Sequence, residues 1–243
     1  MSSDNTHRWP VVAILAGVAL SFTACGTSPG DHGGSAAPGS ASNAGTSLVT
    51  ASPESPAPPT AASPVGLRVG AGGVPFPMPP AGTRHAGTLT GQPLPDPHCT
   101  PGATNPAVTQ DTIASTICRA GWTATVRPPL AVTDTIKAAS VRAYGIAPGT
   151  RGELDHEIPL ELGGDPGSAD DVANLWFEIG PIPNPKDLVE NELNHATCGG
   201  LISLVTAQTA IARRWPTAVE DAGLTRVGQR VCLQAAPTRC VQR

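Results

Sequence analysis

The chain has 243 residues, with 15 Lys and Arg against 19 Asp and Glu, a formal net charge of −4, and only 3% aromatic residues. Phosphate backbones are bound by Lys and Arg, and unpaired bases stack on aromatic side chains. This composition therefore argues against a general nucleic-acid-binding module.

The N-terminal segment predicts export. His7 and Arg8 precede a stretch of apolar or small residues from Val11 to Phe22, and FTACG follows, which is the layout of a secretory signal. A bilayer span needs about 20 residues, more than this stretch offers. The small residues before Cys25 resemble a bacterial lipobox, which implies a signal peptide over 1–24, lipidation of Cys25 and an extracytoplasmic, membrane-anchored protein. An ordinary secretion signal, with an incidental Cys25, is the alternative.

Residues 25–92 are predicted to form a disordered tether. They are dominated by Gly, Ala, Ser, Thr and Pro, with few large apolar side chains. Such a segment buries too little apolar surface to offset the entropy of ordering it. The folded domain is therefore expected over residues 93–243, about the length of one domain.

Five cysteines follow Cys25, and in an exported protein they are expected to oxidise where geometry allows. They can form at most two bridges among themselves. Spacing favours Cys99 with Cys118 and Cys232 with Cys240, but connectivity is open on sequence alone. No Cys-x-x-Cys pair is present, which disfavours a zinc cluster.

The folded part is predicted to contain four helices and one hairpin, an α+β arrangement. Each helix opens on a capping residue and closes on Gly or Trp, which gives the ranges 109–121, 133–145, 184–199 and 203–215. Asn184 and Pro185 supply a cap and a first helical residue. Strand-like runs cover 153–162 and 174–179, and the Gly- and Asp-rich segment between them is typical of a turn.

The order strand, turn, strand, helix resembles the HNH branch of the His-Me finger (ββα-metal) nucleases. The matching segments are DHEIPLELGG at 155–164, NLW at 174–176, NPKDLVENELNHATC at 184–198 and AQTAIARRW at 207–215. More widely, residues 93–215 are similar to a group of secreted, mostly uncharacterised bacterial proteins that carry this HNH-like core. The resemblance implies a small ββα-metal core over about 151–199, with additional helices before and after it.

The resemblance also implies a role for each matching polar residue. His156 corresponds to the general base, and Asn174 to the asparagine that braces the loop carrying the base. Asp155 and Asn184 correspond to ligands of a divalent metal, Mg²⁺ or Mn²⁺, which favours hard oxygen donors. The implied protein is an exported, membrane-tethered hydrolase of phosphodiesters, either nucleic acid or a smaller compound.

Each residue also has a competing structural interpretation. His156 can be a partly buried histidine that is hydrogen-bonded to backbone, Asp155 can cap a turn, and Asn174 can be a loop residue that leads into its strand. For Asn184, a plain helix N-cap is the competing interpretation.

Two observations qualify this expectation. Strand alternation sends Asp155 and His156 to opposite faces, so the two can share a site only if the strand bends or ends there. Residues 153–192 contain eleven acidic residues and one basic residue, Lys186, a local charge of −10 that should repel phosphate. We expect most of these carboxylates on a solvated outer face, and Lys186 in an exposed ion pair with Glu190. The alternative function is a non-catalytic binding or structural lipoprotein of the cell envelope.

Overall fold

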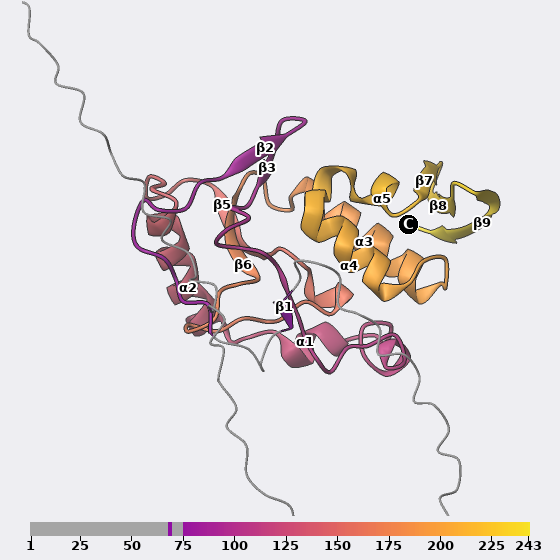
Figure 1. Cartoon of the computed structure of the whole chain (residues 1–243), viewed down its shortest axis with the longest axis horizontal. Coiled ribbons are helices and arrows are strands. Elements are labelled where there is room, and N and C mark those ends of the chain that lie inside the picture. The colour runs from indigo at the N-terminus through magenta and orange to yellow at the C-terminus, as the bar shows by residue number, and fades with distance from the viewer. Residues whose placement is uncertain (1–67, 70–74) are drawn as a thin grey trace, which may run out of the picture.

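The computed structural model describes residues 68–69 and 75–243 (Figure 1). This part of the chain mixes helices with short strands, which confirms the α+β class. The predicted signal peptide, Cys25 and most of the predicted tether lie outside the described residues. Within the described ranges, no helix combines the length and the apolar character that crossing a membrane requires.

The folded part begins earlier than residue 93. Strand β1 (Arg68–Val69) pairs in parallel with β4 (Ala103–Thr104), and β2 (Gly87–Leu89) forms a hairpin with β3 (Gln92–Leu94). Phe76 is buried, and the buried Arg84 donates to the carbonyl oxygens of Leu175 at 3.0 Å and Cys99 at 3.2 Å. Composition averaged over the whole segment hid these two side chains, so the expected boundary at residue 93 is wrong.

The helix predicted over 109–121 is absent. This segment contains turns and a short 3-10 helix, η1 (Ile113–Ser115), followed by the five-residue α1 (Trp122–Val126). The Thr112 hydroxyl donates to the Ala107 carbonyl at 2.9 Å, and the Thr116 hydroxyl donates to the Thr112 carbonyl at 2.7 Å. Local side-chain bonds of this kind compete with the helical pattern, and the sequence contains several threonines here.

Helix α2 (Leu130–Ala143) confirms the second predicted helix, although it begins three residues before Thr133, directly after Pro129. Gly145 closes it with a φ of 63°, as a glycine after a helix commonly does. The helix lies against the hairpin described next, and Lys137 Nζ donates to the Gly152 carbonyl at 2.9 Å.

The central hairpin and the helix that follows it were predicted. β5 (Gly152–His156) pairs with β6 (Leu175–Ile179) in antiparallel register, with His156 opposite Leu175. The first strand ends at His156, well short of residue 162, and η2 (Leu160–Leu162) follows Pro159. The condition for Asp155 and His156 to share a site is therefore met. Helices α3 (Pro185–Cys198) and α4 (Leu204–Arg214) begin after their caps, Asn184 and Ser203, as expected.

The C-terminal region adds elements that the sequence pattern did not predict. η3 (Trp215–Thr217) and α5 (Ala218–Asp221) lead into an antiparallel sheet of β7 (Leu224–Val227), β8 (Arg230–Leu233) and β9 (Ala236–Gln242), drawn in yellow in Figure 1. The largest hydrophobic cluster joins α3, α4 and this sheet. Its fully buried members include Leu193, Ile211, Leu224 and Val231.

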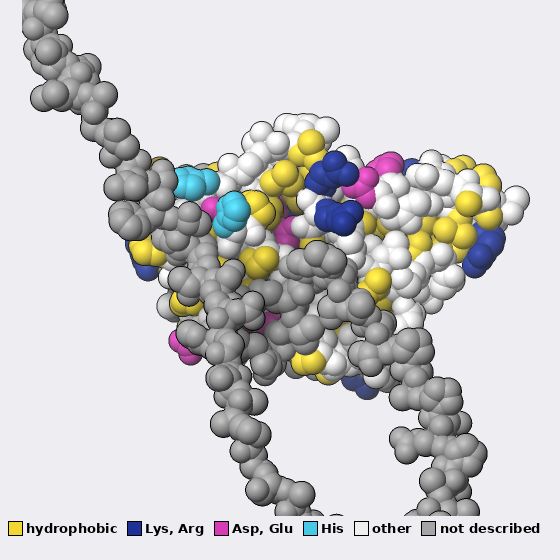
Figure 2. All heavy atoms as spheres, viewed as in Figure 1, with side chains coloured by type: hydrophobic (Ala, Val, Ile, Leu, Met, Phe, Trp, Pro, Cys, Tyr) yellow, Lys and Arg dark blue, Asp and Glu magenta, His cyan; other side chains and the backbone are white. Residues whose placement is uncertain are grey.

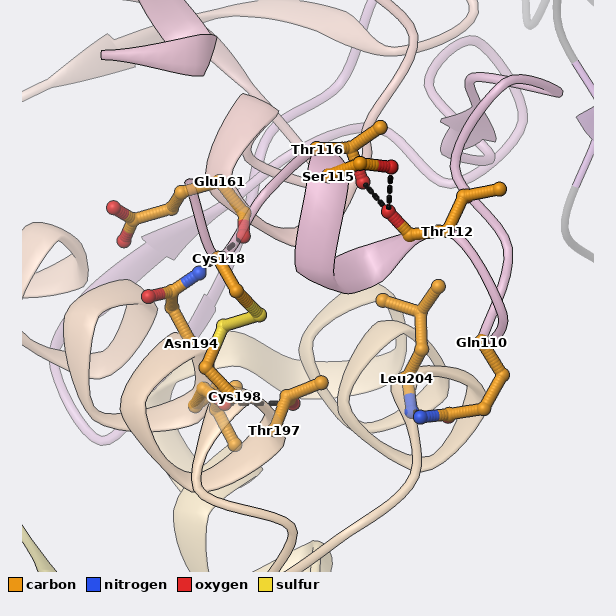
Figure 3. Close-up of a disulfide and its surroundings, with 11 residues drawn as sticks. Gln110, Thr112, Ser115, Thr116, Cys118, Glu161, Asn194, Thr197, Cys198 and Leu204 are labelled. Carbon is orange, nitrogen blue, oxygen red and sulfur yellow. Dashed lines mark hydrogen bonds between the residues drawn. A yellow bond between two sulfur atoms is a disulfide. The ribbon is translucent and has the colours of Figure 1, made fainter. Parts of the chain in front are cut away.

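Two disulfides join cysteines within the described ranges, and one of the two expected pairs is wrong. Cys232 pairs with Cys240, as predicted, but Cys118 pairs with Cys198 and not with Cys99. Figure 3 shows the Cys118–Cys198 bridge between the segment that precedes α1 and the last turn of α3. The bridge therefore fastens the irregular segment 105–121 to the helix that follows the hairpin.

Candidate functional site

A small polar cavity of about 150 Å³ lies where α1, the end of β5, η2 and the first turns of α3 meet. Its lining is dominated by ionisable side chains. They are Arg127, Glu153, Asp155, His156, Glu161, Asp187 and Glu190. The cavity therefore contains the Asp-His pair that the sequence singled out, among further acidic groups.

His156 is held in one orientation by the backbone. It is the last residue of β5, its side chain is buried, and its Nε2 atom lies 3.2 Å from the Pro166 carbonyl oxygen. A carbonyl oxygen only accepts hydrogen bonds, so Nε2 carries the ring proton and Nδ1 keeps a free lone pair. Burial lowers the pKa of His156 to about 4, against the opposing effect of Asp155. The ring is therefore neutral at pH 7 and able to accept a proton at Nδ1.

Asn174 ties together the loop that follows His156. Its Oδ1 accepts from the backbone N–H groups of Ile158 at 2.9 Å and Ala103 at 3.2 Å. Its Nδ2 donates to the carbonyl oxygens of Ile158 at 2.9 Å and Asp165 at 2.8 Å. The loop passes so close that a Cβ atom on Gly164 would lie 1.8 Å from the Ile158 oxygen. The four hydrogen bonds join Asn174 to the loop after His156 and to the neighbouring Ala103. The resemblance implies a bracing asparagine at this place.

Asp155 faces a buried lysine. Lys186 is fully buried, and its Nζ donates to Asp155 Oδ2 at 2.8 Å, to the His156 carbonyl oxygen at 2.7 Å and to Glu190 Oε1 at 2.5 Å. Burial opposes the charged form of Lys186, but Asp155 and Glu190 outweigh it and raise the pKa of the ammonium above its usual value. The same contact holds the pKa of Asp155 below its usual value although burial acts to raise it.

Asn184 acts as a helix cap. Its Oδ1 accepts from the backbone N–H groups of Lys186 at 2.7 Å and Asp187 at 3.1 Å. Its Nδ2 donates to Glu153 Oε1 at 2.8 Å and to Glu178 Oε2 at 3.0 Å. Both ends of the carboxamide are therefore occupied, in agreement with the N-cap interpretation that competed with metal binding.

The residues do not fit the divalent metal that the resemblance implies. A magnesium or manganese site needs carboxylate or carbonyl oxygens directed at one point, usually with waters completing the shell. The Asp155 oxygen is directed at the Lys186 ammonium, and the Asn184 oxygen at two backbone N–H groups. In the part of the chain that the structure describes, no group of three His, Cys, Asp or Glu is placed to hold a metal ion.

The sequence analysis expects most acidic residues of the 153–192 segment on a solvated outer face, and this expectation is wrong. Glu157, Glu178 and Glu192 are buried. Burial raises the pKa of Glu161 to about 7, that of Glu157 to about 8 and that of Glu178 to about 9. In all three it is the largest cause. Much of the local charge of −10 is therefore cancelled by protonation or by ion pairs at neutral pH.

Lys186 also differs from the sequence interpretation. The Lys186–Glu190 ion pair exists, but it is buried and shared with Asp155. The sequence signal for this role was a single lysine within an otherwise acidic segment. On the same helix, His195 is exposed and pairs through Nδ1 with the Gln242 carbonyl oxygen at 3.0 Å.

Comparisons with protein-family models, curated proteins and solved structures gave no match. The resemblance to the HNH-like group accordingly rests on the sequence segments quoted above.

Proposed function

We propose that the protein is an exported hydrolase of the HNH-like class that cleaves phosphodiesters with His156 as its general base. The observation that carries the proposal is the orientation of this ring. Its Nε2–H is fixed by the Pro166 carbonyl, and its basic Nδ1 belongs to a side chain that lines a polar cavity. The β5–β6 hairpin followed by α3 is the part of the fold that we equate with the ββα core.

Three cavity residues divide the chemistry between them. Nδ1 of His156 takes a proton from a water molecule, whose oxygen attacks the phosphorus. Arg127, exposed where it lines the cavity, binds a phosphoryl oxygen. Glu161 has a pKa of about 7 and is partly protonated at neutral pH, so it gives a proton to the leaving oxygen as the P–O bond breaks.

A small phosphodiester suits this site better than a long nucleic acid. The cavity is small, and Arg127 is the one Lys or Arg side chain among the residues that line it. On the face seen in Figure 2, basic, acidic and apolar side chains are interspersed. Long polyanions are bound by continuous basic surfaces, so the proposal narrows to a compact substrate.

A non-catalytic envelope lipoprotein is the second candidate function. It is favoured by the Lys186–Asp155 contact, which uses a side chain that the resemblance assigns to metal binding. In that case the polar cluster would serve the stability of the scaffold. Anchoring through Cys25 is proposed for both candidates, and mass spectrometry of the membrane fraction, with Cys25→Ser as control, tests it.

The test is an assay of the purified chain without residues 1–24. Bis(p-nitrophenyl) phosphate, DNA and RNA are offered in EDTA and with Mg²⁺ or Mn²⁺. We expect hydrolysis of the small diester, its loss in His156→Ala and its retention in His98→Ala, which removes an exposed histidine outside the cavity. If no substrate is cleaved under any condition, the non-catalytic function replaces the hydrolase.

A further inference from the structure

Lys186 occupies an unusual place for a lysine. It is the second residue of α3, it is fully buried, and it is the only basic residue between 153 and 192. Burial of an ammonium group costs several kcal/mol unless its protons are all paired. The three hydrogen bonds to Asp155, Glu190 and the His156 carbonyl meet this requirement.

The oxygen atoms around Lys186 Nζ have the composition of a divalent-cation site. They come from two acidic side chains and one main-chain carbonyl, at 2.8, 2.5 and 2.7 Å. Hard divalent cations take the same donors, carboxylate and carbonyl oxygens. Here the donors converge on an ammonium nitrogen that the protein itself supplies.

We infer that the Lys186 ammonium is a built-in cation that replaces the metal ion of the HNH-like pocket. Two properties follow. The wild-type pocket does not bind divalent metal, and removal of the lysine side chain converts Asp155, Glu190 and the His156 carbonyl into a divalent-cation site. Only the consequence that hydrolysis proceeds without metal rests on the proposed function.

Lys186 also acts as a positioning residue. Its hydrogen bond to the His156 carbonyl joins the first turn of α3 to the residue that carries the base. The ring of the same residue contacts the Pro166 carbonyl, so Lys186 and Pro166 together hold the backbone and the side chain of His156.

The experiment is a calorimetric Mn²⁺ titration at neutral pH, without substrate. We expect no binding to the wild type, binding to Lys186→Ala, and loss of that binding in the double variant Lys186→Ala/Asp155→Asn. Binding of Mn²⁺ to the wild type that Asp155→Asn abolishes would overturn the inference. A folded Lys186→Ala that binds no Mn²⁺ would overturn it as well.

Lys186→Ala leaves acidic side chains buried without their partner and can fail to fold in EDTA. Recovery of the folded state when the variant is refolded with Mn²⁺ then counts for the inference. If the variant folds under neither condition, the melting temperature of the wild type tests the inference. An equal melting temperature in EDTA and in Mn²⁺ supports the inference, and a rise in Mn²⁺ that Asp155→Asn removes rejects it.

The inference about Lys186 and the proposed hydrolase function can fail independently of each other. If the metal-binding pattern is as expected but no diester is cleaved, the proposed function fails and the built-in cation stands. If hydrolysis requires Mn²⁺ and the wild type binds it through Asp155, the hydrolase stands and the built-in cation fails.

Discussion

At the scale of single residues, burial sets the protonation of the groups around His156. The histidine loses its proton far below pH 7, while Glu161 and Glu157 keep theirs near or above it. Opposite protonation states within one cavity are what general acid–base chemistry requires. The same shifts also make stability depend on pH.

The rate of diester hydrolysis should follow a bell-shaped pH profile. The base must be deprotonated, so activity rises as pH passes about 4, the pKa of His156. The acid must be protonated, so activity falls above about 7, the pKa of Glu161. Measured with Glu161→Gln, the rate should fall and the alkaline limb should disappear. An unchanged alkaline limb would remove Glu161 from the mechanism.

The raised pKa of Glu157 should make the free energy of unfolding depend on pH. Its pKa of about 8 in the fold exceeds its ordinary value of 4.5, so its contribution to stability is complete below pH 4.5 and is lost as pH rises to about 8. In Glu157→Gln the side chain is uncharged in both states, and the variant should gain on the wild type by on the order of a few kcal/mol between pH 5 and 8. Denaturant titrations at several pH values measure this. The exposed Asp111→Asn should show no such gain.

At the scale of elements, the site depends on a loop and an irregular segment that other residues hold in place. Asn174 holds the loop after β5 through four hydrogen bonds. The Cys118–Cys198 bridge holds the segment that leads to Arg127. Loops that carry binding residues are commonly positioned by a rigid scaffold in this way.

Asn174→Asp tests the loop brace with a change of one group. The carboxylate keeps the oxygen that accepts from Ile158 and Ala103, but it replaces the donor that serves the Ile158 and Asp165 carbonyls. Since one buried and one partly buried carbonyl then face an acceptor, we expect a loss of roughly 2 to 5 kcal/mol in the free energy of unfolding. Thermal unfolding measures it. A loss below about 1 kcal/mol would show that the brace contributes little.

Removing either disulfide should destabilise the fold, by unequal amounts. The Cys118–Cys198 bridge closes a sequence separation of 80 residues and the Cys232–Cys240 bridge one of 8. Chain entropy then gives about 4.5 kcal/mol for the first and about 2.5 kcal/mol for the second. Double alanine variants of each pair, compared by denaturant unfolding, supply matched controls. The reverse order would show that the irregular segment is held by other contacts.

Sequence reasoning was most successful where local signals decide the structure. The caps Asn184 and Ser203 and the turn after the first strand located two helices and the hairpin. The helix predicted after Thr109 failed because threonine side-chain bonds, which compete with the helix, cannot be told from spacing. The C-terminal sheet was missed because its strands are placed by contacts with α3 and α5, which the sequence pattern does not show.

The candidate site was predictable only in part. The Asp-His pair and Asn174 were identified from the motif, and the structure places each within or beside one cavity. The role of Lys186 was not, because a lysine four residues before a glutamate on a helix usually forms a solvated pair. Only the approach of β5 to the start of α3 shows that this lysine faces inward.

At the scale of the whole molecule, the residues before 93 are part of the fold. Arg84 donates to the Ser140 hydroxyl at 3.3 Å in addition to its two carbonyl acceptors, and so joins α2, β6 and the segment around Cys99. The Trp215 indole N–H donates to the Pro93 carbonyl at 2.7 Å. Residues 84–93 therefore contact both α2 and the β5–β6 hairpin on one side and the end of α4 on the other.

A chain that begins at residue 68, and so keeps β1, should melt at the same temperature as the chain without residues 1–24, whereas a chain that begins at residue 93 should melt lower or fail to fold. The reason is that the shorter chain lacks Phe76 and Arg84, which are buried. Arg84→Ala in the longer chain should itself cost on the order of 1 to 3 kcal/mol, because buried carbonyls lose their donor. Calorimetry of the four proteins checks this. Equal melting temperatures for all of them would restore residue 93 as the boundary.

The position of Lys186 gives a rule for sorting sequences. It stands directly after the Asn-Pro that opens α3, 31 residues beyond Asp155 and four before Glu190. The role that we infer for Lys186 predicts that a chain with an Asp-His pair and a lysine at that place works without a metal ion, and that one with a short neutral or acidic residue there binds one. One residue position would then distinguish metal-free from metal-dependent proteins with the same fold.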